Sequence, residues 1–145
     1  MGHVRQRMTR LSKSATMAAA SSFVPPAPMG ILTTHVLDTM NGCAAAGMRV
    51  ALYRLDGDTP RLLRELALDA DGRAGGPLLE GEAFEVGRYR LLFEVGAYFR
   101  ARGAVLRAPE FLDLVPVDFG VSDAASHYHV PLLAGPWSYS TYRGT

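Results

Sequence analysis

The stretch RYRLLFEV, residues 88–95, carries the clearest structural signal in this sequence. Its alternate residues fall on two faces, one apolar and one charged: Tyr89, Leu91, Phe93 and Val95 on the first, and Arg88, Arg90 and Glu94 on the second. A period of two residues is the period of an extended strand, whose successive side chains point to opposite faces. Residues 88–95 are therefore predicted to form a half-buried strand of an antiparallel sheet.

Short apolar segments separated by turn residues continue this pattern on both sides. They predict strands at residues 31–38, 48–55, 61–68, 111–119, 129–133 and 138–143. The turn DGDTP at residues 56–60 separates two of them, and one short helix is expected at residues 97–102, ending at Gly103. The sequence predicts an all-β fold, a two-sheet sandwich of about eight strands with one short helix.

Composition limits the classes of function. With 145 residues and 48% hydrophobic side chains, the chain is long enough for one domain with a substantial core. A formal net charge of +1 gives no overall attraction to nucleic acid. Nucleic acid is therefore not expected as a partner. No stretch approaches the roughly 20 apolar residues of a membrane-spanning helix. A membrane is therefore not expected as a partner either.

Residues 1–28 differ in composition from the expected domain at residues 29–145. The first acidic residue is Asp38, and a basic start is followed by a run of small residues at 16–22 and by three prolines. This composition is consistent with a secretory signal or an organellar transit peptide, which would place the protein in the periplasm or in an organelle. The run at residues 16–24 is short and weakly apolar for a signal, which favours a disordered leader and a cytoplasmic protein.

Three histidines lie in the expected domain. In His127-Tyr128-His129 the two imidazoles lie on the same side of an extended strand, as a pair of zinc ligands would. A third ligand is required, and His35 is a candidate, although no second metal-binding signature accompanies it. A single histidine in a strand is more often a surface or core residue. These residues alone leave a zinc site and a purely structural role open.

Other catalytic motifs are not found. Residues 69–80 depart from a calcium-binding loop at Arg73 and Ala74, and Cys43, the only cysteine, has no nucleophile motif around it and cannot form an intramolecular disulfide. The sequence contains no GxSxG motif and no glycine-rich phosphate-binding loop.

Three blocks of sequence resemble the 5-hydroxyisourate hydrolase branch of the transthyretin-like family: ILTTHVLDTMNG at residues 31–42, DADGR at 69–73 and HYHVPLLAGPWSYSTYRGT at 127–145. The resemblance covers residues 31–145. Three positions depart from the family pattern: Thr145 stands where serine is usual, Ala44 where proline is expected, and Trp137 where tyrosine is usual.

The resemblance implies a homotetrameric enzyme, a dimer of dimers, with active-site residues His35, Arg73 and His129. It also implies that Tyr142, Arg143, Gly144 and Thr145 line the pocket of a small purine-derived substrate, with neither a metal nor another cofactor. The implied reaction is the hydrolysis of 5-hydroxyisourate to 2-oxo-4-hydroxy-4-carboxy-5-ureidoimidazoline in urate breakdown.

Two other functions remain open beside this one: a transthyretin-like protein that binds a small ligand without turnover, and a zinc-dependent amidohydrolase. In hormone-binding transthyretins other residue types stand at the positions of His35, Arg73 and His129, and the terminal tetrapeptide is absent. This difference favours the enzyme.

A chemical role can be assigned to each side chain. A neutral histidine, with an ordinary pKa of about 6.5, can accept a proton from water near neutral pH. The planar fork of arginine donors suits a flat, imide-like substrate and a developing oxyanion. We therefore expect His35 and His129 to position and activate water while Arg73 stabilises the oxyanion, with the choice of proton acceptor between the histidines left open.

Overall fold

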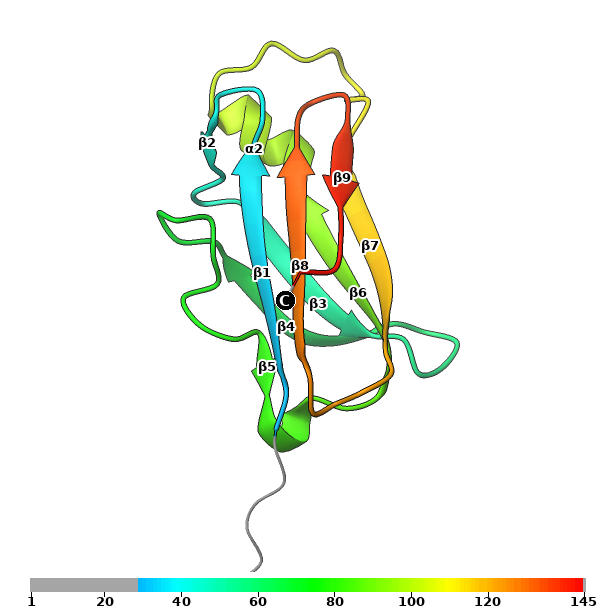
Figure 1. Cartoon of the computed structure of the whole chain (residues 1–145). Helices are drawn as coiled ribbons and strands as arrows, with labels where there is room; N and C mark the ends of the chain where they lie inside the picture. Colours follow the sequence, from blue (N-terminus) through cyan, green and yellow to red (C-terminus); the bar gives the residue numbers. More distant parts are fainter. Residues whose placement is uncertain (1–28, 145) are drawn as a thin grey trace, which may run out of the picture.

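A computed structural model describes residues 29–144 of the chain as two β-sheets packed face to face (Figure 1). The first sheet has the order β2-β1-β8-β9, with β5 paired to β1, and the second has the order β4-β3-β6-β7. The predicted all-β sandwich with one short helix is confirmed. The predicted leader at residues 1–28 and Thr145 lie outside the described residues.

The first sheet contains β1 (Ile31–Asp38), β2 (Cys43–Ala44), β5 (Leu79–Glu80), β8 (His127–Ala134) and β9 (Tyr139–Thr141). The second contains β3 (Arg49–Arg54), β4 (Arg61–Ala67), β6 (Gly87–Glu94) and β7 (Leu114–Val121). A 3₁₀ turn, η1 (Gly81–Ala83), precedes β6, and the helix α2 (Val95–Ala101) follows it. None of the helices described in residues 29–144 is long and apolar enough to cross a membrane.

The core lies between the two sheets and uses the alternation that the sequence predicts. In β6, Leu91 and Phe93 are fully buried, while Arg88 on the opposite face is exposed. Leu32 and Leu132 face them from β1 and β8 and are also fully buried. Burying one such side chain contributes about 1.5–3 kcal/mol. The strand pattern therefore identifies the residues that hold the sheets together.

Two predicted boundaries are wrong at the junction of β6 and β7. The helix begins at Val95 and not at residue 97, and β7 begins at Leu114 and not at residue 111. The reason is a contact between the two segments: the backbone N–H of Gly96 donates to the carbonyl oxygen of Asp113 at 3.0 Å. The chain before Leu114 is thus bonded to the start of α2.

Boundaries also differ in the first sheet. The strand predicted at residues 129–133 extends over His127–Ala134, so both histidines of the HYH sequence lie within it. The strand predicted at residues 138–143 covers only Tyr139–Thr141. The two-residue strands β2 and β5 were not predicted, because two residues are too few to show a period.

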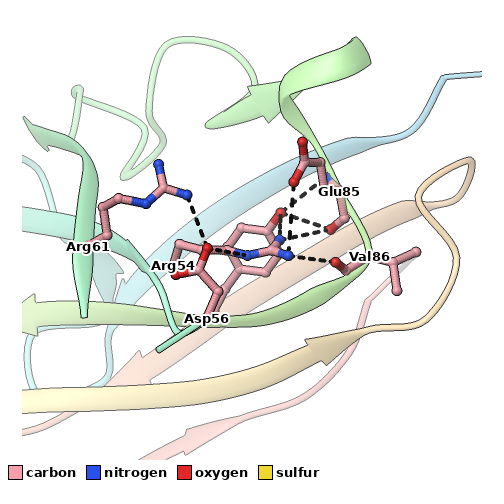
Figure 2. A network of polar contacts seen from close by, with 6 residues as sticks. Arg54, Asp56, Arg61, Glu85 and Val86 are labelled. Carbon is pink, nitrogen blue, oxygen red and sulfur yellow. Dashed lines mark hydrogen bonds and ion pairs between the residues drawn. The ribbon is translucent and has the colours of Figure 1, made fainter. Parts of the chain in front are cut away.

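An arginine network fixes the segment that leads into β6 (Figure 2). The guanidinium of Arg54 lies 4.8 Å from the ring centroid of Tyr89 and donates hydrogen bonds of 2.7 Å to the Tyr89 hydroxyl and to the Val86 carbonyl oxygen. Asp56 and Glu85 form ion pairs with it at 3.7 and 4.0 Å. The hydrogen bonds come from Nη1 and Nη2, while Nε of Arg54 is buried without a hydrogen-bond partner among residues 29–144. These contacts give Arg54 a structural role, at a place distinct from the histidines.

Candidate active site

The parallel pairing of β1 with β8 brings the predicted site residues together. These two strands run side by side in Figure 1, with Ile31 level with His127, Thr33 with His129 and His35 with Pro131. Residues level with each other in a parallel pair point to the same face. The side chains of Thr33, His35, His127 and His129 therefore share the outer face of the first sheet, whereas the residues between them are buried.

Arg73 reaches this face because its loop folds back onto β1. Arg73 forms an isolated β-bridge with His35, and the backbone N–H of Val36 donates to the Gly72 carbonyl oxygen at 2.9 Å. Inside the loop, Oδ1 of Asp69 accepts the backbone N–H of Arg73 at 3.0 Å. The aspartate at the start of the DADGR block thus shapes the turn that places the arginine next to the histidine.

The position of Arg73 depends on the glycine before it. Gly72 has a φ of +71°, and a Cβ there would lie 2.5 Å from the Val36 carbonyl oxygen. Gly75, in the same loop, has a similar φ of +77° but nothing within 4 Å of its Cβ position.

The two glycines should differ in their tolerance of alanine. Gly75→Ala should lower the free energy of unfolding by about 1 kcal/mol, for the left-handed backbone alone. Gly72→Ala should lower it by about 3 kcal/mol, since the loop must also move. Urea unfolding of both variants measures the difference, and equal losses would contradict the close contact.

The end of the chain folds over the same face. After β9 it turns back toward β1 and β8 (Figure 1), and the backbone N–H of Gly144 donates to the His129 carbonyl oxygen at 2.7 Å. A Cβ on Gly144 would lie 2.8 Å from Cδ2 of His129, so the glycine backbone rests against the imidazole. Contacts within this one chain thus hold the C-terminal segment beside His129.

The other predicted pocket residues are placed differently. The side chain of Tyr142 is exposed. The guanidinium of Arg143 lies 4.0 Å from the ring centroid of Tyr128, whose side chain is buried. In a single chain, Arg143 thus packs against Tyr128 and not against the histidines. Thr145 lies outside the described residues.

Thr33 belongs to the cluster, although sequence reasoning did not single it out. Its Oγ1 lies 2.8 Å from Nε2 of His127 and 2.8 Å from Nδ1 of His129. The sequence contains Thr33 two positions before His35, but it gives no sign that β1 pairs in parallel with β8. Only that register shows the threonine to be a neighbour of both imidazoles.

Burial and neighbouring charge keep His129 neutral. Burial lowers its pKa below the ordinary value of 6.5, and the positive charge of Arg73 lowers it further, followed by smaller effects of His127 and His35. Each of these effects disfavours the imidazolium form. His129 therefore has a free lone pair at neutral pH, as a general base requires.

The electrostatic effect of Arg73 can be measured without substrate. Because the pKa of His129 is lowered, more than half of this imidazole should be neutral at pH 6.5. Arg73→Met removes a positive charge that disfavours protonation, so the pKa of His129 should rise. Arg61→Met, in β4 of the other sheet, should leave it unchanged. Titration of the histidine ring signals by NMR provides the measurement, and an unchanged or lower pKa in Arg73→Met would contradict this placement of Arg73.

The predicted alternative of a zinc site is not supported by the geometry. Within residues 29–144, no group of three histidine, cysteine, aspartate or glutamate side chains is arranged to hold a metal ion. The rings of His127 and His129 have centroids 6.3 Å apart and are connected through Thr33. His35 does not complete a ligand set with them.

Known proteins share this fold and align with most of this chain. The model of the HIUase/Transthyretin family matches residues 32–144. A protein of Rhizobium meliloti named 5-hydroxyisourate hydrolase 2 is 55% identical over 116 residues, which are 80% of this chain and 97% of that protein.

Two solved structures extend the comparison. The crystal structure of an (S)-allantoin synthase superposes with a TM-score of 0.78 at 45% identity, covering 90% of this chain and 49% of that one. This chain thus spans about half of the allantoin synthase. The 5-hydroxyisourate hydrolase of Klebsiella pneumoniae superposes with a TM-score of 0.65 at 33% identity, covering 79% of this chain and 99% of that one. From the fold, the family match and these identities, the chain belongs to the HIUase/Transthyretin family.

Proposed function

We propose that this protein is a hydrolase that opens the ring of 5-hydroxyisourate, giving 2-oxo-4-hydroxy-4-carboxy-5-ureidoimidazoline in purine breakdown. The Rhizobium and Klebsiella relatives carry the name of this activity, at 55% and 33% identity. The observation that carries the proposal is the convergence of His35, Arg73 and His129 on one sheet face. A neutral imidazole, that of His129, beside the fixed positive charge of Arg73 is what water activation and oxyanion stabilisation require.

The mechanism follows from these roles. A water molecule attacks the ring carbonyl carbon of the substrate while the neutral imidazole of His129 accepts one of its protons. Arg73 donates hydrogen bonds to the carbonyl oxygen, on which negative charge develops. When the tetrahedral intermediate collapses, the C–N bond breaks, and the proton held by His129 passes to the leaving nitrogen. His35, bridged to Arg73 through the backbone, orients the water or the substrate. The cycle needs no cofactor.

Residues 142–144 form one wall of the proposed pocket. The contact of Gly144 with the His129 ring supports this assignment, because it brings the C-terminal segment to the base. Exposed Tyr142 is available to a substrate above the sheet. For Arg143 to contact the substrate or the histidines, its guanidinium has to leave the ring of Tyr128. Thr145 would provide one hydroxyl donor.

The opposite wall is proposed to come from another subunit of a homotetramer, a dimer of dimers. In one chain Arg73 and His127 are exposed, so a facing copy would be needed to shield the pocket and its single reacting water from bulk solvent. Strands β7 and β9 end their sheets and can pair with a second copy. Sedimentation should give the mass of four chains. A fully active monomer would contradict the shared site.

The cytoplasm is the proposed compartment, because residues 16–24 are only weakly apolar for a secretory signal. Fractionation of cells followed by intact-mass measurement tests this assignment. Uncleaved protein is expected in the cytoplasmic fraction, and a cleaved form in an exported fraction would overturn it.

Product analysis tests the proposed reaction directly. Carbon-13 NMR of freshly generated 5-hydroxyisourate should show the ring-opened carboxylate appearing faster with protein than in buffer. If the protein binds 5-hydroxyisourate and the substrate decays only at its spontaneous rate, the function is ligand binding without turnover, and the proposal is wrong.

A further inference from the structure

A single hydroxyl group lies between two imidazoles on the outer face of the first sheet. Oγ1 of Thr33 is 2.8 Å from Nδ1 of His129 and 2.8 Å from Nε2 of His127. Among residues 29–144, no other side chain forms a hydrogen bond to either histidine ring. The protonation of Nδ1 in His129 is thus coupled to the direction in which the Thr33 hydroxyl points.

A threonine hydroxyl has one hydrogen and can donate it to only one of the two rings. In one arrangement, Thr33 donates to Nδ1 of His129, and a neutral His129 then carries its proton on Nε2. In the other, Thr33 donates to Nε2 of His127 and accepts the N–H of Nδ1 in His129. Only the second arrangement leaves Nε2 of His129 with a free lone pair.

We propose that Thr33 is a positioning residue that holds the proton of His129 on Nδ1, so that Nε2 is the base. His127 completes the arrangement, because its Nε2 accepts the Thr33 hydroxyl hydrogen and fixes the direction of that hydroxyl. This inference rests on the hydrolysis proposed above. It also specifies which histidine takes the proton, and on which nitrogen.

The geometry fits the full reaction cycle. When Nε2 of His129 takes a proton from water, the ring becomes an imidazolium whose Nδ1–H still donates to Thr33. No hydrogen bond in the His129-Thr33-His127 chain has to reverse, and a hydrogen bond to a charged donor is stronger than one to a neutral donor. Nε2 then delivers the same proton to the leaving nitrogen, and the chain returns to its starting state.

The rival explanation is that Thr33 only stabilises the pairing of β1 with β8. In that case, loss of its hydroxyl would lower the stability of the fold without changing the proton position on His129. Thr39, just after β1, allows a matched comparison because its Oγ1 donates to the Ala134 carbonyl oxygen at 3.1 Å, away from the histidines. Thr39→Val removes the same kind of group between the same two strands.

The test combines the histidine tautomer with kinetics. In full-length protein labelled with nitrogen-15 on histidine, above pH 6.5, long-range proton–nitrogen spectra should show His129 protonated on Nδ1 in the wild type. Thr33→Val should move the proton to Nε2 and lower kcat by about tenfold to a hundredfold with little change in KM. Thr33→Ser should restore both, and Thr39→Val should change neither.

A failure of the role proposed for Thr33 and a failure of the proposed hydrolysis give different results. An Nε2–H tautomer in the wild type, an unchanged tautomer in Thr33→Val, or no rescue by Thr33→Ser would overturn the role of Thr33. The tautomer spectrum needs no substrate. Wild-type protein that shows the expected tautomer but does not accelerate 5-hydroxyisourate decay would instead overturn the proposed function, and with it the catalytic meaning of this arrangement.

Discussion

Replacement of His129 by alanine should lower kcat/KM for 5-hydroxyisourate by about a hundredfold to ten-thousandfold, the usual contribution of a positioned general base. Burial and the charge of Arg73 lower the pKa of this side chain and favour its neutral form, and Thr33 and Gly144 fix its ring. Initial rates measured over a range of substrate concentrations give the comparison with the wild type.

A second substitution separates loss of the base from loss of packing. Alanine leaves a gap where the Gly144 backbone meets the ring, whereas His129→Gln keeps most of the volume and lacks a basic nitrogen. Both variants should be similarly inactive and should unfold at temperatures close to that of the wild type, since the side chain lies on the outer face. An active, folded His129→Gln variant would assign the base to another residue.

Replacement of Arg73 by glutamate should lower kcat/KM by about a hundredfold to a thousandfold, the usual effect of losing one oxyanion donor. The reversed charge also opposes a developing oxyanion and raises the pKa of His129. Arg73→Lys keeps the charge but not the planar fork, so its activity should fall between those of the wild type and the glutamate variant.

The chain offers a matched control for the charge reversal. Arg61 is exposed on β4, in the other sheet, and forms an ion pair with Asp56 at 3.3 Å. Arg61→Glu should retain wild-type kinetics, because an exposed ion pair contributes at most about 1 kcal/mol. If Arg61→Glu and Arg73→Glu lost activity equally, the effect would be general electrostatics and not oxyanion stabilisation by Arg73.

Periodicity predicts the sandwich because burial acts on every second residue of a strand. In β6 the sequence pattern and the buried side chains agree at Tyr89, Leu91 and Phe93. Periodicity does not predict where this strand ends. Val95 continues the apolar alternation of β6, but it is the first residue of α2. The helix start depends on the contact between Gly96 and Asp113, which are 17 residues apart.

The site is predictable only in part, for a similar reason. The resemblance to a known family identified His35, Arg73 and His129, and the structure brings these residues to one face. Thr33 was not predicted, because its role depends on the parallel pairing of two strands. Thr33 and His129 are 96 residues apart, and a local sequence pattern does not show such a pairing. The contact of Arg143 with Tyr128 was not predicted either. It depends on the tertiary structure, and the sequence of the C-terminal motif alone does not indicate it.

The most direct test of the central claim is the ultraviolet absorbance decay of freshly generated 5-hydroxyisourate, with and without chelator-treated wild-type protein. The account predicts decay much faster than the spontaneous reaction, with a rate proportional to protein concentration and unaffected by the chelator. If untreated protein accelerated the decay but chelator-treated protein gave only the spontaneous rate, the enzyme would need a metal. Decay at the spontaneous rate with untreated and with chelator-treated protein would contradict the assignment of the outer face of the first sheet as a hydrolytic active site.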